Sequence, residues 1–276
     1  MKTFHIVTIF NNMEQYSQMK LSFESAGFVD QNCAFTAFDN SVGNDYEPYS
    51  AFNSILDNCE EPYVIFCHQD VVVKGGSSFD HLMGIICDLE KADPRWSLAG
   101  NAGCPECLVH VRRITDPHGG DMGVVQLPQK VLSLDENFFI LKKNSGLKFS
   151  CGLSGFHLYA NDLCLSALLD GRSAYVIDFH LIHLSGGNYD TDDFRESRAN
   201  FQSHWQNKFL FIYFPTPCTI VFLSRFAIVR RVCNSNRGTR LFVRRRKARI
   251  FLERMALNTQ LFMKGLPKRG KCLKSA

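Results

Sequence analysis

The sequence lacks the usual marks of a secreted or membrane-spanning protein. No Asn-x-Ser/Thr glycosylation signal occurs in its 276 residues. The apolar run at 4–10 is followed by polar residues and not by a small-residue cleavage site, so we expect a first strand there instead of a signal peptide. Two prolines and Arg225 interrupt the apolar stretch at 209–229, which disfavours a membrane-crossing helix. These absences favour a cytoplasmic protein, with association at the inner face of the membrane as an open alternative.

A disulfide framework is also disfavoured, although the chain has 11 cysteines. Their number is odd and the chain is large, whereas disulfide scaffolds are typically small. Several cysteines lie inside predicted apolar strands or helices, namely Cys67, Cys87 and Cys164. We therefore expect reduced thiols.

Two short motifs suggest other chemistry but are incomplete. Cys104 and Cys107 form one Cys-x-x-Cys pair, which could bind zinc together with His110 and His118. Because a second pair is missing, a structural zinc ion is the weaker interpretation. The segment 265–272 resembles a phosphate-binding P-loop, but the final Ser/Thr, the preceding strand and the following helix are all missing, so we reject it.

Acidic residues are almost missing from the end of the chain. Residues 225–276 contain 16 of the 31 Lys and Arg residues and a single acid, Glu253. This segment therefore has a formal charge of about +15, and the preceding residues about −11. Such asymmetry suggests an anionic partner for the basic segment.

The basic segment also has helical periodicity. Val243, Ile250, Leu257 and Leu261 are spaced by seven, seven and four residues and are surrounded by arginines, which predicts a basic amphipathic helix. Such a helix is typical of a membrane-surface contact, expected here through 209–262. The alternative is that the apolar residues cover the body of the protein and the charges face water. No nucleic-acid-binding motif accompanies the charge, so a nucleic-acid partner is not expected.

The first half of the chain alternates between strand-like and helix-like segments. At 45% hydrophobic residues it can form a full core, and we expect a domain at 1–215 with an extension at 216–276. The predicted strands are 4–10, 33–38, 63–67 and 97–99, and the predicted helices are 13–26, 49–58 and 79–91. Further on, short strands are predicted at 124–127, 131–134, 138–141 and 173–178, and a helix at 158–169. This pattern predicts an α/β fold with a mixed sheet and helices on both faces.

Polar residues follow each of the first three strands. They are Asn11 and Asn12, then 39–41, then 68–70, where Asp70 ends an apolar strand. In α/β sheets, ligands bind beyond the carboxyl ends of the strands, and a carboxylate placed there can hold a metal or a phosphate-bearing substrate. The three strand ends should therefore meet at one edge of the sheet.

An ordered series of motifs over roughly residues 4–205 carries a family resemblance. The motifs are Thr8-Ile9-Phe10-Asn11, Phe38-Asp39-Asn40-Ser41, His68-Gln69-Asp70-Val71, Gly100-Asn101-Ala102-Gly103, Leu134-Asp135-Glu136, Phe156 to Leu163, and His183-Leu184-Ser185-Gly186-Gly187. In this order they resemble nucleotide-sugar-dependent glycosyltransferases of the GT-A (Rossmann-like) fold, in a bacterial family-2-like branch with His-Gln-Asp-Val in place of Asp-x-Asp.

The resemblance implies roles for particular residues. Asp70 and His183 would hold a divalent cation, Mn²⁺ or Mg²⁺, and His68 replaces the first acid of the common motif. The donor nucleotide would be bound by residues in the first three strand ends, namely Thr8, Phe10, Asn11, Asp39, His68 and Gln69. Asp135 and Glu136 would lie on the acceptor side of the bound sugar nucleotide.

The resemblance further implies that Asp162 is the general base of a single displacement with inversion, because an acceptor hydroxyl must lose its proton. Taken alone, Asp162 would be a solvated helix residue and Asp39 part of a turn. The sequence also departs from the family pattern at Ala51, where many relatives carry an arginine two residues before the asparagine of this helix.

The expected function is transfer of a hexosyl unit from a sugar nucleotide to a glycan or lipid-linked acceptor, as in surface polysaccharide assembly. One alternative is a catalytically silent module that keeps the fold and binds without turnover. The other is a basic protein that binds membrane or nucleic acid through residues 225–276.

Overall fold

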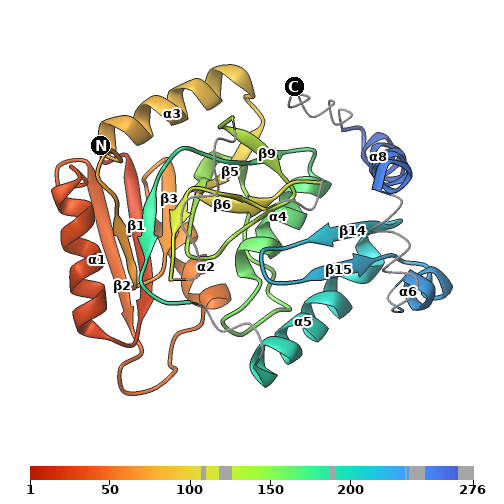
Figure 1. Ribbon diagram of the computed structural model, residues 1–276, viewed down its shortest axis with the longest axis horizontal. Helices are drawn as coiled ribbons and strands as arrows, with labels where there is room; N and C mark the ends of the chain where they lie inside the picture. The colour runs from red at the N-terminus through yellow and green to blue at the C-terminus, as the bar shows by residue number, and fades with distance from the viewer. Residues whose placement is uncertain (107–109, 118–125, 187–190, 234, 236–245, 267–276) are drawn as a thin grey trace.

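The computed structural model describes residues 1–106, 110–117, 126–186, 191–233, 235 and 246–266. Its centre is a seven-stranded sheet with the order β2-β1-β3-β11-β5-β12-β9 (Figure 1). The strands are β1 (Phe4–Phe10), β2 (Cys33–Asp39), β3 (Tyr63–Cys67), β5 (Trp96–Gly100), β9 (Gln129–Val131), β11 (Phe138–Lys142) and β12 (Ser173–Val176). β1, β2 and β3 are parallel neighbours, whereas β11 is antiparallel to both β3 and β5. The expected mixed sheet is confirmed.

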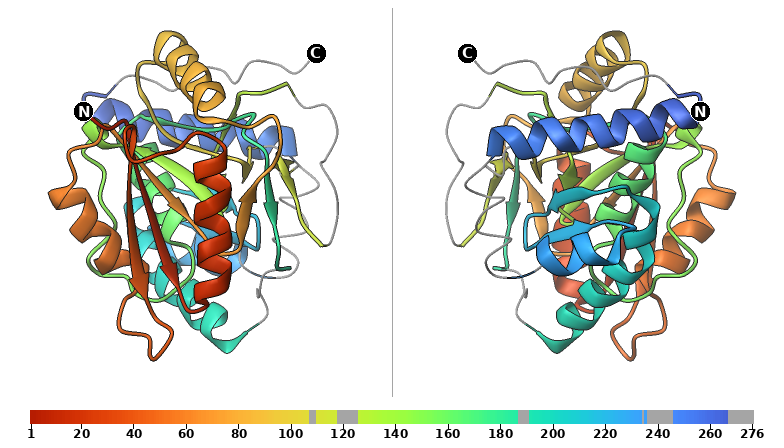
Figure 2. Two further views of the ribbon diagram at one scale, coloured as in Figure 1. Left: turned by 90° about the vertical axis from the view of Figure 1, so that its left-hand side faces the viewer. Right: turned by 90° about the vertical axis from the view of Figure 1, so that its right-hand side faces the viewer.

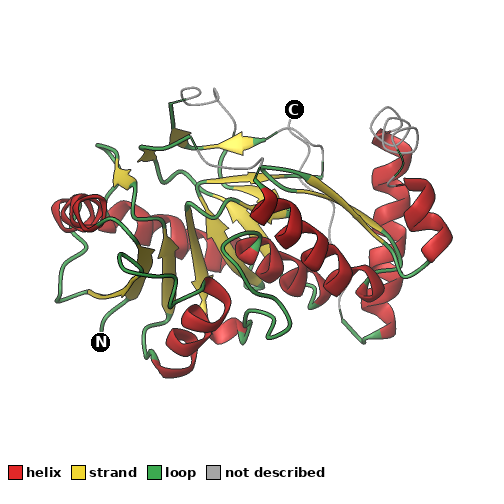
Figure 3. Ribbon diagram, turned by 90° about the horizontal axis from the view of Figure 1, so that it is seen from below, coloured by secondary structure: helices red, strands yellow, loops and turns green. Residues whose placement is uncertain are grey.

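Helices cover both faces of this sheet (Figure 3). α1 (Met13–Ser25) and α3 (Phe79–Ala92) pack on one face, and α2 (Pro48–Asn58) and α4 (Tyr159–Leu169) on the other. β3 shows the reason, because Val64 and Phe66 point into one core and Ile65 and Cys67 into the other. A strand buried on both sides reads as a continuous apolar run, as the sequence of β3 does.

Short signals define the limits of α1. Asn12 is the N-cap, and its side chain accepts hydrogen bonds from the backbone N–H groups of Glu14 and Gln15. Gly27, just past the end, has φ +93°, a conformation that L side chains rarely adopt. The first helix therefore begins directly after the end of β1, which keeps Asn11 and Asn12 at the sheet edge.

Two small sheets flank the large one. One has the order β4-β13-β8, formed by β4 (Val71–Val73), β13 (Leu181–His183) and β8 (Ile114–Thr115). The other has the order β10-β6-β7, formed by β10 (Ser133–Leu134), β6 (Ala102–Cys104) and β7 (Val111–Arg112). The strand predicted at 131–134 is thus divided between β9 and β10. The one predicted at 124–127 is not a strand at 126–127, and 124–125 lie outside the described residues.

The C-terminal part packs on the body of the protein. It contains α5 (Asp192–Trp205), the 3-10 helix η2 (Gln206–Lys208), β14 (Ile212–Pro215), β15 (Ile220–Leu223), α6 (Ala227–Cys233) and α8 (Arg246–Met263). A second 3-10 helix, η1 (Lys143–Ser145), directly follows β11. β14 and β15 form an antiparallel hairpin, and the expected division at 215/216 lies where β14 ends and the turn begins. α6 and α8 lie at the opposite end of the molecule from α1 (Figure 1).

The predicted C-terminal helix is present as α8. Of the two orientations considered for it, the one in which the apolar residues cover the body is confirmed for Leu257 and Leu261, which are buried in the main core. Outside the described residues lie Val243 of the predicted apolar face and the nearby arginines Arg240, Arg244 and Arg245. The P-loop-like residues 267–272 also lie outside them. The apolar face detected from the sequence is therefore the one that packs on the body.

Candidate functional site

The carboxyl ends of β1 and β3 are tied together by one side chain. Gln69 Oε1 accepts hydrogen bonds from the backbone N–H groups of Asn11 at 2.8 Å and Asn12 at 2.9 Å. Gln69 Nε2 in turn donates to Asn11 Oδ1 at 2.7 Å. The expectation that these strand ends meet at one edge is confirmed.

Beside this bridge, three side chains with metal-ligating atoms converge. The three residues are His68, Asp70 and His183. Each offers one ligand atom, and these three atoms all lie within 4.8 Å of one another. Asp70 Oδ1 is 3.3 Å from His183 Nε2 and 4.0 Å from His68 Nδ1. The side chains of Asp70 and His183 are 11% and 13% exposed, whereas that of His68 is 40% exposed. The group is therefore shielded on one side and accessible on the other.

Strand pairing explains how residues so distant in sequence come together. Asp70 follows β3 and immediately precedes β4, and β13 pairs antiparallel with β4 so that His183 lies opposite Val71. The backbone N–H of Leu184 donates to the carbonyl of Asp70 at 2.9 Å. A short two-strand ladder therefore sets the distance between the two side chains.

The electrostatics of the group favour a bound positive charge. Burial disfavours the ionised form of Asp70, but hydrogen bonding and charge interaction with His183 outweigh it and hold the pKa of this carboxyl well below its usual range. Burial likewise disfavours the charged form of His183, yet Asp70 raises the pKa of this imidazole. Burial and the charge of His183 lower the pKa of His68. A neutral imidazole and a carboxylate are the forms that bind divalent cations.

His68 is held by a residue at the start of α4. Its Nε2 lies 3.1 Å from the hydroxyl of Tyr159. A metal-ligating histidine typically uses its second ring nitrogen in this way, which fixes the orientation of the ring. Tyr159 had no assigned role in the sequence prediction, since its spacing alone does not show that it reaches His68.

Glu136 holds the start of α4 in place. Its Oε1 accepts from the backbone N–H of Ala160 at 3.3 Å, which compensates for a helix start that has no side-chain N-cap bond at Leu158. Burial and the neighbouring Asp135 raise the pKa of Glu136 well above its usual value. The structure thus places Glu136 as a helix-capping group.

Asp135 is partly buried and lies close enough to act on both histidines. Its charge opposes the lowering of the pKa of His68 and adds to the raised pKa of His183. Its Oδ1 accepts from the backbone N–H of Asn137 at 3.0 Å and from the side-chain amide at 2.6 Å. Asp135 is therefore a carboxylate near His68 and His183, and hydrogen bonds within its own turn hold it in place.

Asp162, the base implied by the resemblance, is fully buried. Its Oδ2 accepts from the backbone N–H of Ser150 at 2.7 Å, and its Oδ1 from the Ser150 hydroxyl at 2.8 Å and from Trp205 Nε1 at 2.9 Å. Burial raises the pKa of Asp162 in spite of these donors. The carboxylate thus links α4 to α5, and Ser150 and Trp205 are partners that sequence reasoning missed.

Three residues expected to bind the nucleotide have contacts of their own within the protein. Thr8 is buried within the sheet, with its hydroxyl 3.3 Å from Cys67 Sγ. Phe10 is buried, and its ring stacks on Tyr16 with 4.7 Å between centroids. Asp39 is exposed at the end of β2, where it accepts from the N–H of Ser41 at 2.8 Å in a local turn.

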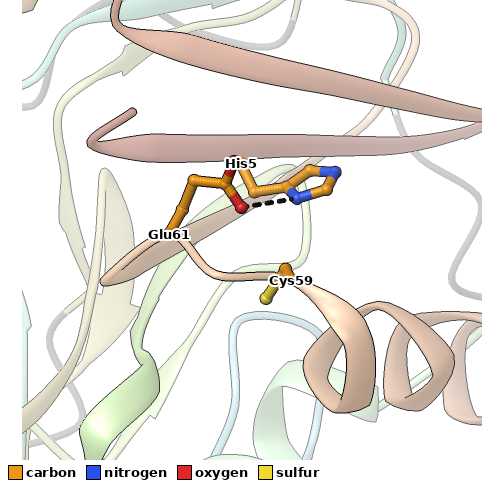
Figure 4. Close-up of side chains that lie close together, drawn as sticks. All are labelled: His5, Cys59 and Glu61. Atoms are coloured by element: carbon orange, nitrogen blue, oxygen red, sulfur yellow. Dashed lines mark hydrogen bonds and ion pairs between the residues drawn. The ribbon is translucent and has the colours of Figure 1, made fainter. Parts of the chain in front are cut away.

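A second group of ligand-type side chains lies at the opposite end of β1 (Figure 4). It consists of His5, Cys59 and Glu61. Both ring nitrogens of His5 already have partners, Glu61 at 3.1 Å and Thr36 at 2.8 Å. Burial raises the pKa of the Cys59 thiol. Hydrogen bonding therefore accounts for this group without an ion.

The structure describes two of the four residues of the possible zinc site, Cys104 and His110. Cys104 is buried in β6, and burial and the charge of Arg112 lower the pKa of His110. Cys107 and His118 lie outside the described residues, as does Gly187 of the His183 motif.

No helix in the described part of the chain is both long enough and apolar enough to cross a bilayer.

Comparison with known proteins gives one clear relative. No family model matches the sequence. A protein of Fuscovulum blasticum, "ATP synthase subunits region ORF 6", is 37% identical over 187 residues, covering 65% of this chain and 74% of the relative. The chain belongs to the family of this protein. The relative's name states no activity, so family membership leaves the reaction open.

Similarity to solved structures is weaker. GalNAc-T7, crystallised with UDP, GalNAc and Mn²⁺, is 7% identical with a TM-score of 0.47, over 75% of this chain and 50% of that one. TarS of S. aureus, crystallised with UDP-GlcNAc, is 12% identical with a TM-score of 0.47, over 72% and 65%. This chain thus spans less than two thirds of either protein. Likeness at this level decides neither the activity nor the ligands of this chain.

Proposed function

We propose that the protein is a nucleotide-sugar-dependent glycosyltransferase of the GT-A type. The observation that carries the proposal is the convergence of His68, Asp70 and His183 where β3 ends, next to the bridged ends of β1 and β3. Ligand sites of α/β sheets lie at this edge. The same residues belong to the motif series that resembles the family. The donor would be a nucleoside diphosphate sugar, and the acceptor a glycan or a lipid-linked saccharide.

His68, Asp70 and His183 would hold a divalent cation, Mn²⁺ or Mg²⁺. Two imidazoles with one carboxylate suit Mn²⁺ better than Mg²⁺, which prefers all-oxygen surroundings. When bound, the cation would supply positive charge to the diphosphate leaving group. Tyr159 would orient His68, and Gln69 would keep the backbone of Asn11 and Asn12 at the donor side of the site.

Two carboxylates are candidates for the base that takes the acceptor proton in an inverting transfer. The resemblance implies Asp162, but that side chain is fully buried and bonded to Ser150 and Trp205. Asp135 is partly exposed, and its charge contributes to the pKa of both His68 and His183. A base must reach the proton that it removes, so the geometry favours Asp135.

The direct test is a thermal-shift screen of sugar nucleotides with Mn²⁺ and with chelator. A ligand that binds the folded state raises the melting temperature, and we expect one sugar nucleotide to do so only with metal. Asp70→Asn should remove the metal-dependent shift, whereas the matched control Asp88→Asn, on the exposed surface of α3, should keep it. Release of UDP or its analogue from the positive donor, with added saccharide acceptors, then measures transfer. No response to any sugar nucleotide would overturn the proposal.

A further inference from the structure

α8 has apolar residues on two sides, one packed on the body and one exposed. Its inward side includes charged and polar groups: Arg249 donates to the carbonyl of Glu106 at 2.7 Å, and Arg254 binds the Glu106 carboxylate at 2.6 and 2.9 Å. Glu253 accepts from the backbone N–H of Tyr213 at 2.8 Å. Leu257 and Leu261 complete the contact with the body. These bonds hold α8 in one orientation.

The outward side of α8 is apolar. Phe251, Met255 and Phe262 follow one another at intervals of four and seven residues and are 63%, 54% and 72% exposed. Leu252 and Met263 extend the stripe and are also exposed. An ordinary surface helix presents its polar face to water, so an outward apolar face indicates a partner.

α6, at the same end of the molecule, also exposes apolar side chains. The segment leading into it and the helix itself expose Phe226, Ile228, Val229 and Val232. Seen from the end of the molecule where they lie, α6 and α8 both face the viewer (Figure 2, right). The nine exposed apolar residues of 226–232 and 251–263 are called the terminal face below.

Charge identifies the kind of partner. Arg225 and Arg231 are exposed beside the apolar residues of α6, and Lys247 is exposed at the start of α8. The sequence from 225 onward has 16 basic residues and one acid, and that acid, Glu253, is buried against the body. A second copy of this face would bring like charges together, which disfavours a dimer. Exposed aromatics and methionines among basic side chains match an anionic lipid surface.

We propose that the terminal face lies in the plane of an anionic membrane surface, with the apolar side chains of α6 and α8 inserted at the headgroup boundary. The arginines and lysines around it would contact lipid phosphates. Because α8 is fixed to Glu106 and Tyr213, docking would also set the orientation of the body of the protein relative to the membrane. This inference does not depend on the proposed transferase activity.

Flotation of the full chain with lipid vesicles tests the proposal. We expect binding to vesicles that contain phosphatidylglycerol, little binding to pure phosphatidylcholine, and weaker binding at high salt. Phe251→Gln with Phe262→Gln should reduce binding by about tenfold or more, since two large apolar side chains no longer insert. Leu21→Gln, an equally exposed apolar position on α1, should change nothing.

Three results would overturn the proposal. The first is equal flotation of the double variant and the wild type. The second is light scattering that shows a dimer which the double variant abolishes, with no vesicle binding. The third is tight binding to nucleic acid in the absence of any lipid binding. Because both positions are exposed, unchanged melting of the double variant verifies that it is folded.

Discussion

His183 Nε2 lies 3.3 Å from Asp70 Oδ1, and this contact joins two strand ends that are far apart in the sequence. It exists only because β13 pairs with β4. A histidine and a carboxylate so close together form an ion pair when no cation is present, and they offer two ligands when one is. The pairing of β4 with β13 therefore sets the distance between the two residues on which the proposed cation site depends.

Gln69 should prove important for the shape of the donor side. Gln69→Ala removes three hydrogen bonds, and we expect a loss of about 1–2 kcal/mol in the free energy of unfolding, because each exposed bond contributes modestly. Donor-induced thermal shifts should fall in parallel. Gln69→Glu keeps the acceptor oxygen and loses only the bond that Gln69 donates to Asn11 Oδ1, so its loss of stability should be smaller in chemical denaturation. An alanine variant with wild-type stability and donor binding would contradict this role.

Asp135 and Asp162 should respond differently to the same change. Asp135→Asn should lower the transfer rate by about 10²–10⁴-fold while melting changes little, as expected of a base. Asp162→Asn should lower stability by about 1–3 kcal/mol, because an amide group replaces one acceptor oxygen facing Ser150 and Trp205. Rate assays and melting curves on both variants separate the roles. Lost transfer with normal melting in Asp162→Asn alone would return the base to Asp162.

Glu253 should make the attachment of α8 depend on pH. Burial raises the pKa of Glu253 to about 7, with Arg249 opposing the shift and the charge of Glu106 adding to it. A carboxyl whose pKa is raised in the folded state stabilises the protein at low pH, and this contribution is lost as pH rises from about 4.5 through about 7. Melting temperature should therefore fall over this window more steeply in the wild type than in Glu253→Gln. Identical slopes in the two proteins would show that Glu253 does not titrate in this way.

Local signals in the sequence predicted much of the fold. β1 and β3 are continuous apolar runs with polar ends, and both strands have the predicted limits. The three strand ends were predicted to converge, and the structure joins Asn11 to Gln69. β4 and β13 have three residues each, and their pairing joins segments more than 100 residues apart, so no local pattern could show that they are neighbours.

Burial is the property that local patterns predicted least well. Thr8 and Phe10 are buried beside Cys67 and Tyr16, and the spacing of the motif does not show these contacts. The spacing of Leu257 and Leu261 correctly gave a helix and one of its faces. Which apolar face meets the body depends on Glu106, a residue distant in sequence, so the outward face of α8 could not be found by periodicity alone.

The most direct test of the central claim is calorimetric titration of the full chain with Mn²⁺, alone and with UDP. Mildly alkaline buffer is required because Asp70 raises the pKa of His183, and a proton on that ring competes with the metal. We expect one Mn²⁺ site in the wild type, and binding weakened by about tenfold or more in His183→Ala. His5→Ala disrupts the second ligand-type group and should leave Mn²⁺ binding unchanged. Absence of binding in the wild type, or loss of binding in His5→Ala with retention in His183→Ala, would contradict the central claim.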